Sequence, residues 1–132
     1  MKLESLTPNL MVEDVQETIN YYHGVLGFDT IDKVPENGVD LVWANLKKGD
    51  VEIMVQSVES LIEDIPEIRH EKIGGGTTLF IKMTGVEKLY EDLYEAADVV
   101  VQMKDTFYGT KEFTIRDVNG YFLTFAELME SN

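Results

Sequence analysis

The chain has 132 residues, of which 44% are apolar and 27% charged, so it can form one domain with a core but not two independent cores. Its net charge of −14, which no cluster of Lys and Arg offsets locally, excludes nucleic acid and anionic membrane surfaces as favoured partners. The sequence contains no Cys, which excludes disulfides and Cys-ligated metals, and no stretch approaches the roughly 18 to 20 apolar residues of a membrane span.

The first half of the chain predicts one strand, one helix and three further strands. Residues 6–12 favour a strand, and the apolar spacing of Val15, Ile19, Tyr22 and Leu26 is typical of an amphipathic helix. Asp14 is the expected N-cap of this helix, and Gly24 or Gly27 can end it at the C-terminus in the left-handed conformation. Three extended segments follow, at residues 28–33, 39–46 and 51–56, with a turn at 47–50.

The second half predicts the same order. A linker over about residues 58–76, beginning with a short acidic helix or turn, separates a first module (about 5–57) from a second (about 77–128). The second module is expected to contain a strand at 77–83, a helix on Val86, Leu89, Leu93 and Ala97 with Thr84 as its cap, and strands at 99–103, 112–116 and 121–127.

The two halves are related by a constant offset. Val15 aligns with Val86 and Gly49 with Gly120, in both cases 71 residues later. Identity between the halves is slight, so chance can supply part of the match, but the agreement of two separate landmarks favours a duplicated β-α-β-β-β unit in an α+β protein.

Strand alternation assigns side chains to faces. If residues 47–50 form the loop, Leu46 pairs with Val51, Asn45 with Glu52 and Trp43 with Met54. One face of this hairpin is then aliphatic. The other face mixes apolar and polar side chains as small-molecule sites do; it carries Leu41, Trp43, Asn45, Glu52, Met54 and Gln56.

Three other strands have one apolar and one mixed face. Asn9 and Met11 share the mixed face of the first strand, and Thr78 and Phe80 that of the first strand of the second module. In the last strand we expect Leu123 and Phe125 to face the helix and Phe122 and Thr124 to face the other way. The alternative is that the mixed faces meet solvent, with Trp43 and Phe80 in ordinary packing roles.

Two longer motifs resemble a known superfamily. Val12-Glu13-Asp14-Val15 is followed by Ile19-Asn20-Tyr21-Tyr22 and Leu26-Gly27-Phe28. The second motif runs from Tyr108 through Arg116-Asp117-Val118-Asn119-Gly120 to Phe125-Ala126-Glu127. Over about residues 6–127 the chain is similar to the vicinal oxygen chelate superfamily, which includes glyoxalase I, bleomycin-resistance proteins and extradiol dioxygenases, although Val118 replaces the usual proline of its turn.

The resemblance implies two β-α-β-β-β modules whose eight strands form an open cup, in a homodimer. Catalytic members hold a metal at four inward positions, which align here with Thr7, Glu52, Thr78 and Thr124. Threonine hydroxyls are weak ligands, and a catalytic site needs about three good ones, so we expect neither a metal nor a cofactor. His23, at the end of the first helix, and His70, in the linker, are expected to be solvated, with His70 reaching a partner's cup as the alternative.

The expected function is that of a cytoplasmic, metal-independent binder of a small organic molecule, similar to the bleomycin-resistance branch. Glu52 would orient a polar or cationic group, or act as a general base, or simply be satisfied by Asn45, Thr7 or Lys82. An enzyme of this fold (a lyase, isomerase or dioxygenase) and an interaction subunit with a filled cup are the alternatives. The expected ligand-binding residues are Asn9, Met11, Trp43, Asn45, Glu52, Met54, Gln56, Thr78, Phe80, Tyr108, Phe122 and Thr124.

Overall fold

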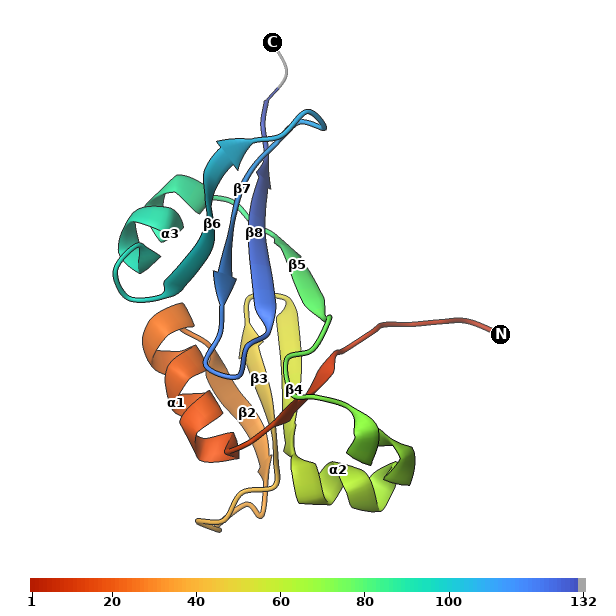
Figure 1. The fold of residues 1–132 in the computed structure, drawn as a ribbon. Helices are drawn as coiled ribbons and strands as arrows, with labels where there is room; N and C mark the ends of the chain where they lie inside the picture. Colours follow the sequence, from red (N-terminus) through yellow and green to blue (C-terminus); the bar gives the residue numbers. More distant parts are fainter. Residues whose placement is uncertain (131–132) are drawn as a thin grey trace. The chain divides into compact units, whose positions relative to one another are not determined.

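The computed structural model describes residues 1–130, and the chain divides into two compact units, Met1–Ile73 (unit 1) and Gly74–Asn132 (unit 2). The elements of unit 1 are β1 (Asn9–Val12), α1 (Val15–Leu26), β2 (Asp29–Val34), β3 (Trp43–Lys48), β4 (Val51–Ser57), α2 (Val58–Asp64) and the 3-10 helix η1 (Pro66–His70) (Figure 1). The elements of unit 2 are β5 (Thr78–Lys82), α3 (Val86–Leu93), β6 (Asp98–Asp105), β7 (Thr110–Arg116) and β8 (Phe122–Leu128).

Each unit contains one four-stranded sheet with the same topology. The strand orders are β1-β4-β3-β2 in unit 1 (sheet 1) and β5-β8-β7-β6 in unit 2 (sheet 2), and in each sheet the first pair is parallel and the other two are antiparallel. The predicted α+β class with two β-α-β-β-β modules is therefore confirmed, whereas the homodimer stays a prediction. Within the described residues, no helix is both long and apolar enough to cross a membrane.

Helix α1 begins and ends where its sequence predicts. Asp14 Oδ1 accepts a hydrogen bond from the Glu17 amide at 3.0 Å, which satisfies one of the free N–H groups of the first turn. The helix ends at Gly27, whose φ of 76° favours glycine, while Gly24 lies inside the helix and is not an exit. The buried stripe includes Thr18, 1% exposed, rather than the predicted Ile19.

Helix α1 packs on one face of sheet 1. Ala44 and Leu46 of β3 and Ile53 and Val55 of β4 are at most 1% exposed, and they form the aliphatic face that the alternation predicts. Their burial removes this face from water, so the functional side chains of unit 1 must come from the other face of the sheet.

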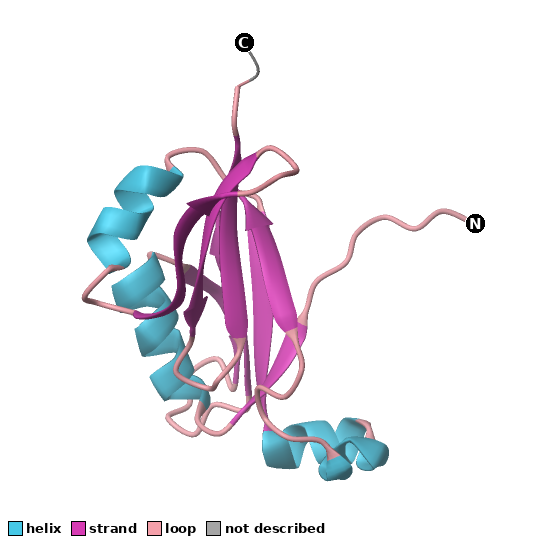
Figure 2. Cartoon of the chain, turned by 45° about the horizontal axis from the view of Figure 1, so that its top comes forward, coloured by secondary structure: helices cyan, strands magenta, loops and turns pink. Residues whose placement is uncertain are grey.

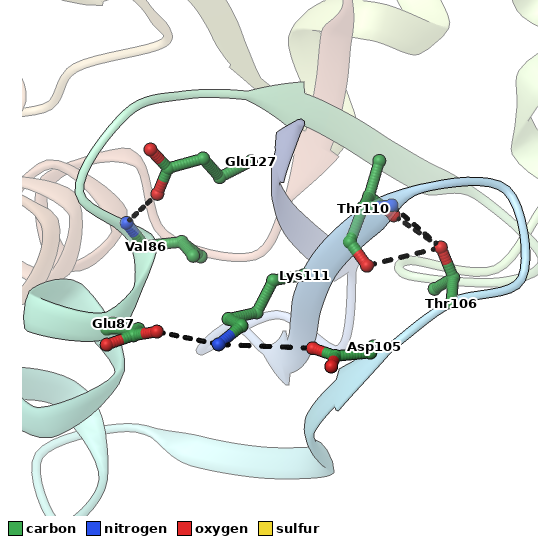
Figure 3. A network of polar contacts seen from close by, with 7 residues as sticks. All are labelled: Val86, Glu87, Asp105, Thr106, Thr110, Lys111 and Glu127. Carbon is green, nitrogen blue, oxygen red and sulfur yellow. Dashed lines mark hydrogen bonds and ion pairs between the residues drawn. The ribbon is translucent and has the colours of Figure 1, made fainter. Parts of the chain in front are cut away.

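Helix α3 is capped by a residue far away in the sequence. The predicted Thr84 cap is wrong, because the N-cap position is Gly85 and no side chain of its own turn caps the helix. Instead, Glu127 Oε1 of β8 accepts hydrogen bonds from the amides of Gly85 and Val86, both at 3.0 Å. Figure 3 shows the bond from Val86. The helix then ends at Leu93, so the predicted helical position Ala97 lies beyond it.

Two strands begin later than predicted. β1 starts at Asn9 and not at residue 6, since Pro8 has no N–H to continue a ladder. β3 starts at Trp43 and not at residue 39. The linker contains α2 and η1, which Figure 2 shows as helices directly after sheet 1.

Candidate functional site

The candidate site of unit 1 is the face of sheet 1 opposite α1. We call it the Trp43 face. Its members share one side of the strands because the ladder pairs Trp43 with Gln56, Asn45 with Met54 and Asn9 with Met54. The face consists of Asn9, Met11, Trp43, Asn45, Glu52, Met54 and Gln56. All seven were predicted for the site, and their role in binding stays a prediction.

The hairpin that carries this face differs from its predicted register by two residues. Leu46 pairs with Ile53 and not with Val51, and Asn45 pairs with Met54 and not with Glu52. The turn is shorter than expected, because Gly49 takes a φ of 58° and a two-residue turn closes the hairpin between Lys48 and Val51. A shift of two residues in the pairing keeps every side chain on the same face of the sheet, so the predicted faces are correct although the predicted pairs are not.

Glu52 is linked to Asn45 on this face. Asn45 Nδ2 donates a hydrogen bond to Glu52 Oε1 at 3.0 Å, and both side chains are half-buried. Asn45 Oδ1 is buried, and within residues 1–130 no donor reaches it. Of the three partners that the sequence suggested for Glu52, Asn45 is therefore the one that contacts it. Glu52 Oε2 and Asn45 Oδ1 can each still accept hydrogen bonds.

Gln56 is held by other side chains of the same unit. Its Oε1 accepts from Asn9 Nδ2 at 2.8 Å, and its Nε2 donates to Ser60 Oγ and Asp64 Oδ2 of α2 at 2.8 and 2.9 Å. Gln56 is only 7% exposed. Gln56 thus ties β1 and α2 to β4, and its contact with a ligand stays a prediction.

In unit 2, four predicted residues share one face of sheet 2. Thr78 pairs with Phe122 and Phe80 with Thr124, while Leu123 and Phe125 point to the other face and are buried, as predicted. Phe80 is 51% exposed, and the Arg116 guanidinium lies 5.3 Å from the centre of the Phe122 ring. The Thr124 hydroxyl is hydrogen-bonded to that of Thr114 at 2.7 Å.

The sequence pattern missed Glu112, a buried carboxylate of sheet 2. It is 8% exposed and accepts from Tyr108 Oη and Thr110 Oγ1, both at 2.8 Å. The hydrogen bond to Glu112 raises the pKa of the Tyr108 phenol, and burial adds to this. Thr110 is in turn bonded to Thr106 across the β6–β7 turn (Figure 3). The signal that could have found Glu112 is its period-two spacing with Thr110 and Thr114.

The four positions that the resemblance assigns to a metal do not suit one. Thr7, Thr78 and Thr124 offer only neutral hydroxyls, and that of Thr124 is already paired with Thr114. Glu52 is the single carboxylate. Elsewhere in residues 1–130, no three His, Cys, Asp or Glu side chains lie together as a metal site requires.

The two histidines lie outside the predicted site residues. The His23 side chain is 67% exposed, and its Nδ1 lies 2.9 Å from the Phe28 carbonyl oxygen. His70 is exposed at the end of η1. Both positions agree with the solvated roles expected from the sequence.

A hollow of unit 1 lies at another place. It measures about 350 Å³ and lies at the start of α1, where Glu13, Asp14, Asp40 and Glu59 contribute to its wall. None of the twelve expected ligand-binding residues lines it, although Leu41, which the alternation assigned to the mixed face, does.

Comparison with known proteins places the chain in one superfamily. The family model described as Glyoxalase/Bleomycin resistance protein/Dioxygenase superfamily matches residues 3–125. No curated protein sequence matches the chain significantly.

Solved structures match the whole chain at low identity, which shows the fold alone. TioX from Micromonospora sp. ML1 is 20% identical with a TM-score of 0.75, covering 96% of this chain and 99% of that one. The bleomycin-binding protein of Streptomyces verticillus, solved with copper(II)-bleomycin, is 19% identical with a TM-score of 0.65, covering 99% of both chains. A glyoxalase/bleomycin resistance protein/dioxygenase from Nocardioides is 14% identical with a TM-score of 0.77, covering 100% of this chain and 87% of that one.

Proposed function

Since the chain belongs to the glyoxalase/bleomycin resistance protein/dioxygenase superfamily, we propose that it binds a small organic molecule against the Trp43 face without the help of a metal. The observation that carries this proposal is the composition of the face. A half-buried tryptophan and two methionines adjoin a carboxylate and an amide that keep free acceptor capacity. An apolar wall with a few oriented polar groups is typical of sites for small molecules.

The metal-free character of the proposed site follows from ligand chemistry. Hydroxyl groups of threonine are weak ligands for the divalent ions that catalytic members of such families use, and one carboxylate does not hold an ion tightly. Glu52 already accepts a hydrogen bond from Asn45, so it is oriented for a polar group of the ligand. In our proposal, Glu52 therefore positions the ligand.

Two further features belong to this proposal. We expect a homodimer, because the outer edges of β1 and β2 have unpaired backbone groups that a second copy can cover. We also expect the protein to act in the cytoplasm, since a chain without Cys is suited to a reducing compartment. The bleomycin-binding protein of similar fold supports the general idea of a small organic ligand.

The test uses the chain's single tryptophan as a local probe. Protein purified without chelators is first analysed for metals and then dialysed against EDTA, and its Trp43 fluorescence is titrated with a library of small organic compounds. The proposal predicts saturable changes in fluorescence that survive the EDTA step. A stoichiometric transition metal whose removal abolishes ligand binding would contradict the proposal and would favour the enzyme alternative.

A further inference from the structure

We propose that the ligand of the Trp43 face is an organic cation with N–H donors, an ammonium or guanidinium group on an apolar body. This inference rests on the proposed function and narrows the class of ligand. It follows from which hydrogen-bonding groups of the face are used and which are left over.

Among the described residues, the Trp43 face has two acceptor atoms that take part in no hydrogen bond. In the described part of the chain, Glu52 takes part in one hydrogen bond, through Oε1, and in no ion pair, so Oε2 keeps its full acceptor capacity. Asn45 Oδ1 is buried and accepts nothing. The amide cannot be turned round, because its oxygen would then face the carboxylate oxygen of Glu52.

The side-chain amide donors of the same face are neutral and partly used. Asn9 Nδ2 donates to Gln56, and both recorded bonds of Gln56 Nε2 go to α2. Asn45 Nδ2 donates to Glu52. Asn9 Nδ2 and Asn45 Nδ2 each keep one further N–H, but these are neutral donors, whereas a ligand that brings donors would find the charged Oε2 of Glu52. Hydrogen bonds to a charged group are the stronger ones, so the face favours a ligand with donors.

Charge around the face favours a cation over a neutral donor. Asp32 of β2 pairs with Asn45 across the ladder and adds a second, exposed carboxylate to this side of the sheet. Lys47 is opposite Glu52 in the register, but it is exposed and forms no ion pair with it within 4.0 Å. Residues 1–73 contain 15 Asp and Glu against 6 Lys and Arg, so unit 1 attracts cations as a whole.

The apolar side chains of the face suit such a ligand. The ring of Trp43 attracts a cation through its π electrons and packs against an apolar body, and Met54, which pairs with Asn45, adapts to irregular shapes. Trp43, Met54 and the Asn45–Glu52 pair thus combine an apolar wall with an anionic end.

The experiment compares matched compounds on EDTA-dialysed protein. Each apolar body (phenyl, naphthyl, cyclohexyl and decyl) is tested as its ethylammonium, ethanol and propionate derivative, and Trp43 fluorescence measures the Kd. We expect saturable binding only for ammonium members, or at least tenfold tighter binding than for the matched alcohol. Binding confined to alcohols or carboxylates would overturn this inference and leave the proposed function standing, whereas no binding across the library would overturn both.

Two variants test whether Glu52 causes the preference for ammonium compounds. Glu52→Gln keeps the shape and removes the charge, and it should weaken ammonium binding about tenfold or more while the alcohol's Kd changes less than twofold. Glu17→Gln is the matched control, since it removes one exposed carboxylate from α1, on the other face of the sheet. Equal weakening by both variants would show a general charge effect and would contradict the assignment to Glu52.

The salt dependence of ligand binding to the unaltered protein is an independent test of charge recognition. Raising the ionic strength from about 0.02 to 0.5 M should weaken ammonium binding severalfold and leave alcohol binding unchanged. If both compounds respond alike, Glu52 does not recognise charge and the inference is wrong.

Discussion

Replacing Glu127 with alanine should uncap helix α3 and destabilise unit 2. Glu127 Oε1 accepts from the amides of both Gly85 and Val86 at 3.0 Å, and no side chain of the helix's own first turn caps it. The loss of a helix cap costs about 0.5–2 kcal/mol, and the loss of a negative charge at a helix N-terminus about 0.3–1 kcal/mol. We therefore expect Glu127→Ala to lower the free energy of unfolding by about 1–2 kcal/mol.

Urea denaturation followed by far-UV circular dichroism measures this loss, and hydrogen exchange assigns it to the helix. The Val86 amide should exchange faster in Glu127→Ala, while amides of sheet 1 keep their local protection. Glu127→Gln keeps an acceptor and should lose less than Glu127→Ala. Glu95→Ala, which removes an exposed carboxylate just after α3, is the control. If Glu127→Ala is as stable as Glu95→Ala, the long-range cap contributes nothing and the reasoning is refuted.

Two further predictions concern the core and the Tyr108–Glu112 pair. Ile53→Ala, at a position 1% exposed under α1, should cost about 2–5 kcal/mol in urea unfolding, whereas Val39→Ala, at an exposed position, should cost less than about 0.5 kcal/mol; equal losses would contradict the assignment of faces. Because the pKa of Tyr108 is raised, its contribution to stability is present below the unfolded pKa and is lost as the pH rises through the folded pKa. In alkaline titration at 295 nm, with Tyr108→Phe as the reference, Glu112→Gln should lower that pKa toward the ordinary tyrosine value, and an unchanged titration would refute the contact.

The sequence predicted the features that depend on near neighbours. The helix from Val15 to Leu26 and its Asp14 cap depend on residues close together in the sequence, and the structure confirms both, with Thr18 in place of Ile19 in the buried stripe. Alternation in β3 and β4 correctly assigned the faces even though the pairing was two residues out. The face of a side chain depends only on whether its position in the strand is odd or even. A shift of two residues therefore changes the pairing partners but not the faces.

The features that were missed depend on residues distant in the sequence or on loop conformation. Glu127 caps a helix that begins 41 residues earlier, and the sequence near Thr84 contains no pattern that predicts this contact. The hairpin register depended on the backbone of Gly49, which sequence alone did not fix. The bonds of Gln56 to Ser60 and Asp64 were not predicted, because they depend on α2 following β4 directly.

Binding at the Trp43 face can be observed through the indole N–H resonance of the single tryptophan in a ¹⁵N-labelled sample kept in EDTA. On titration with the tightest compound of the library, we predict that the Trp43 indole signal and the Asn45 side-chain amide signals shift together and saturate at one ligand per chain. Saturating shifts that leave both signals in place and appear at other residues would contradict binding at the Trp43 face.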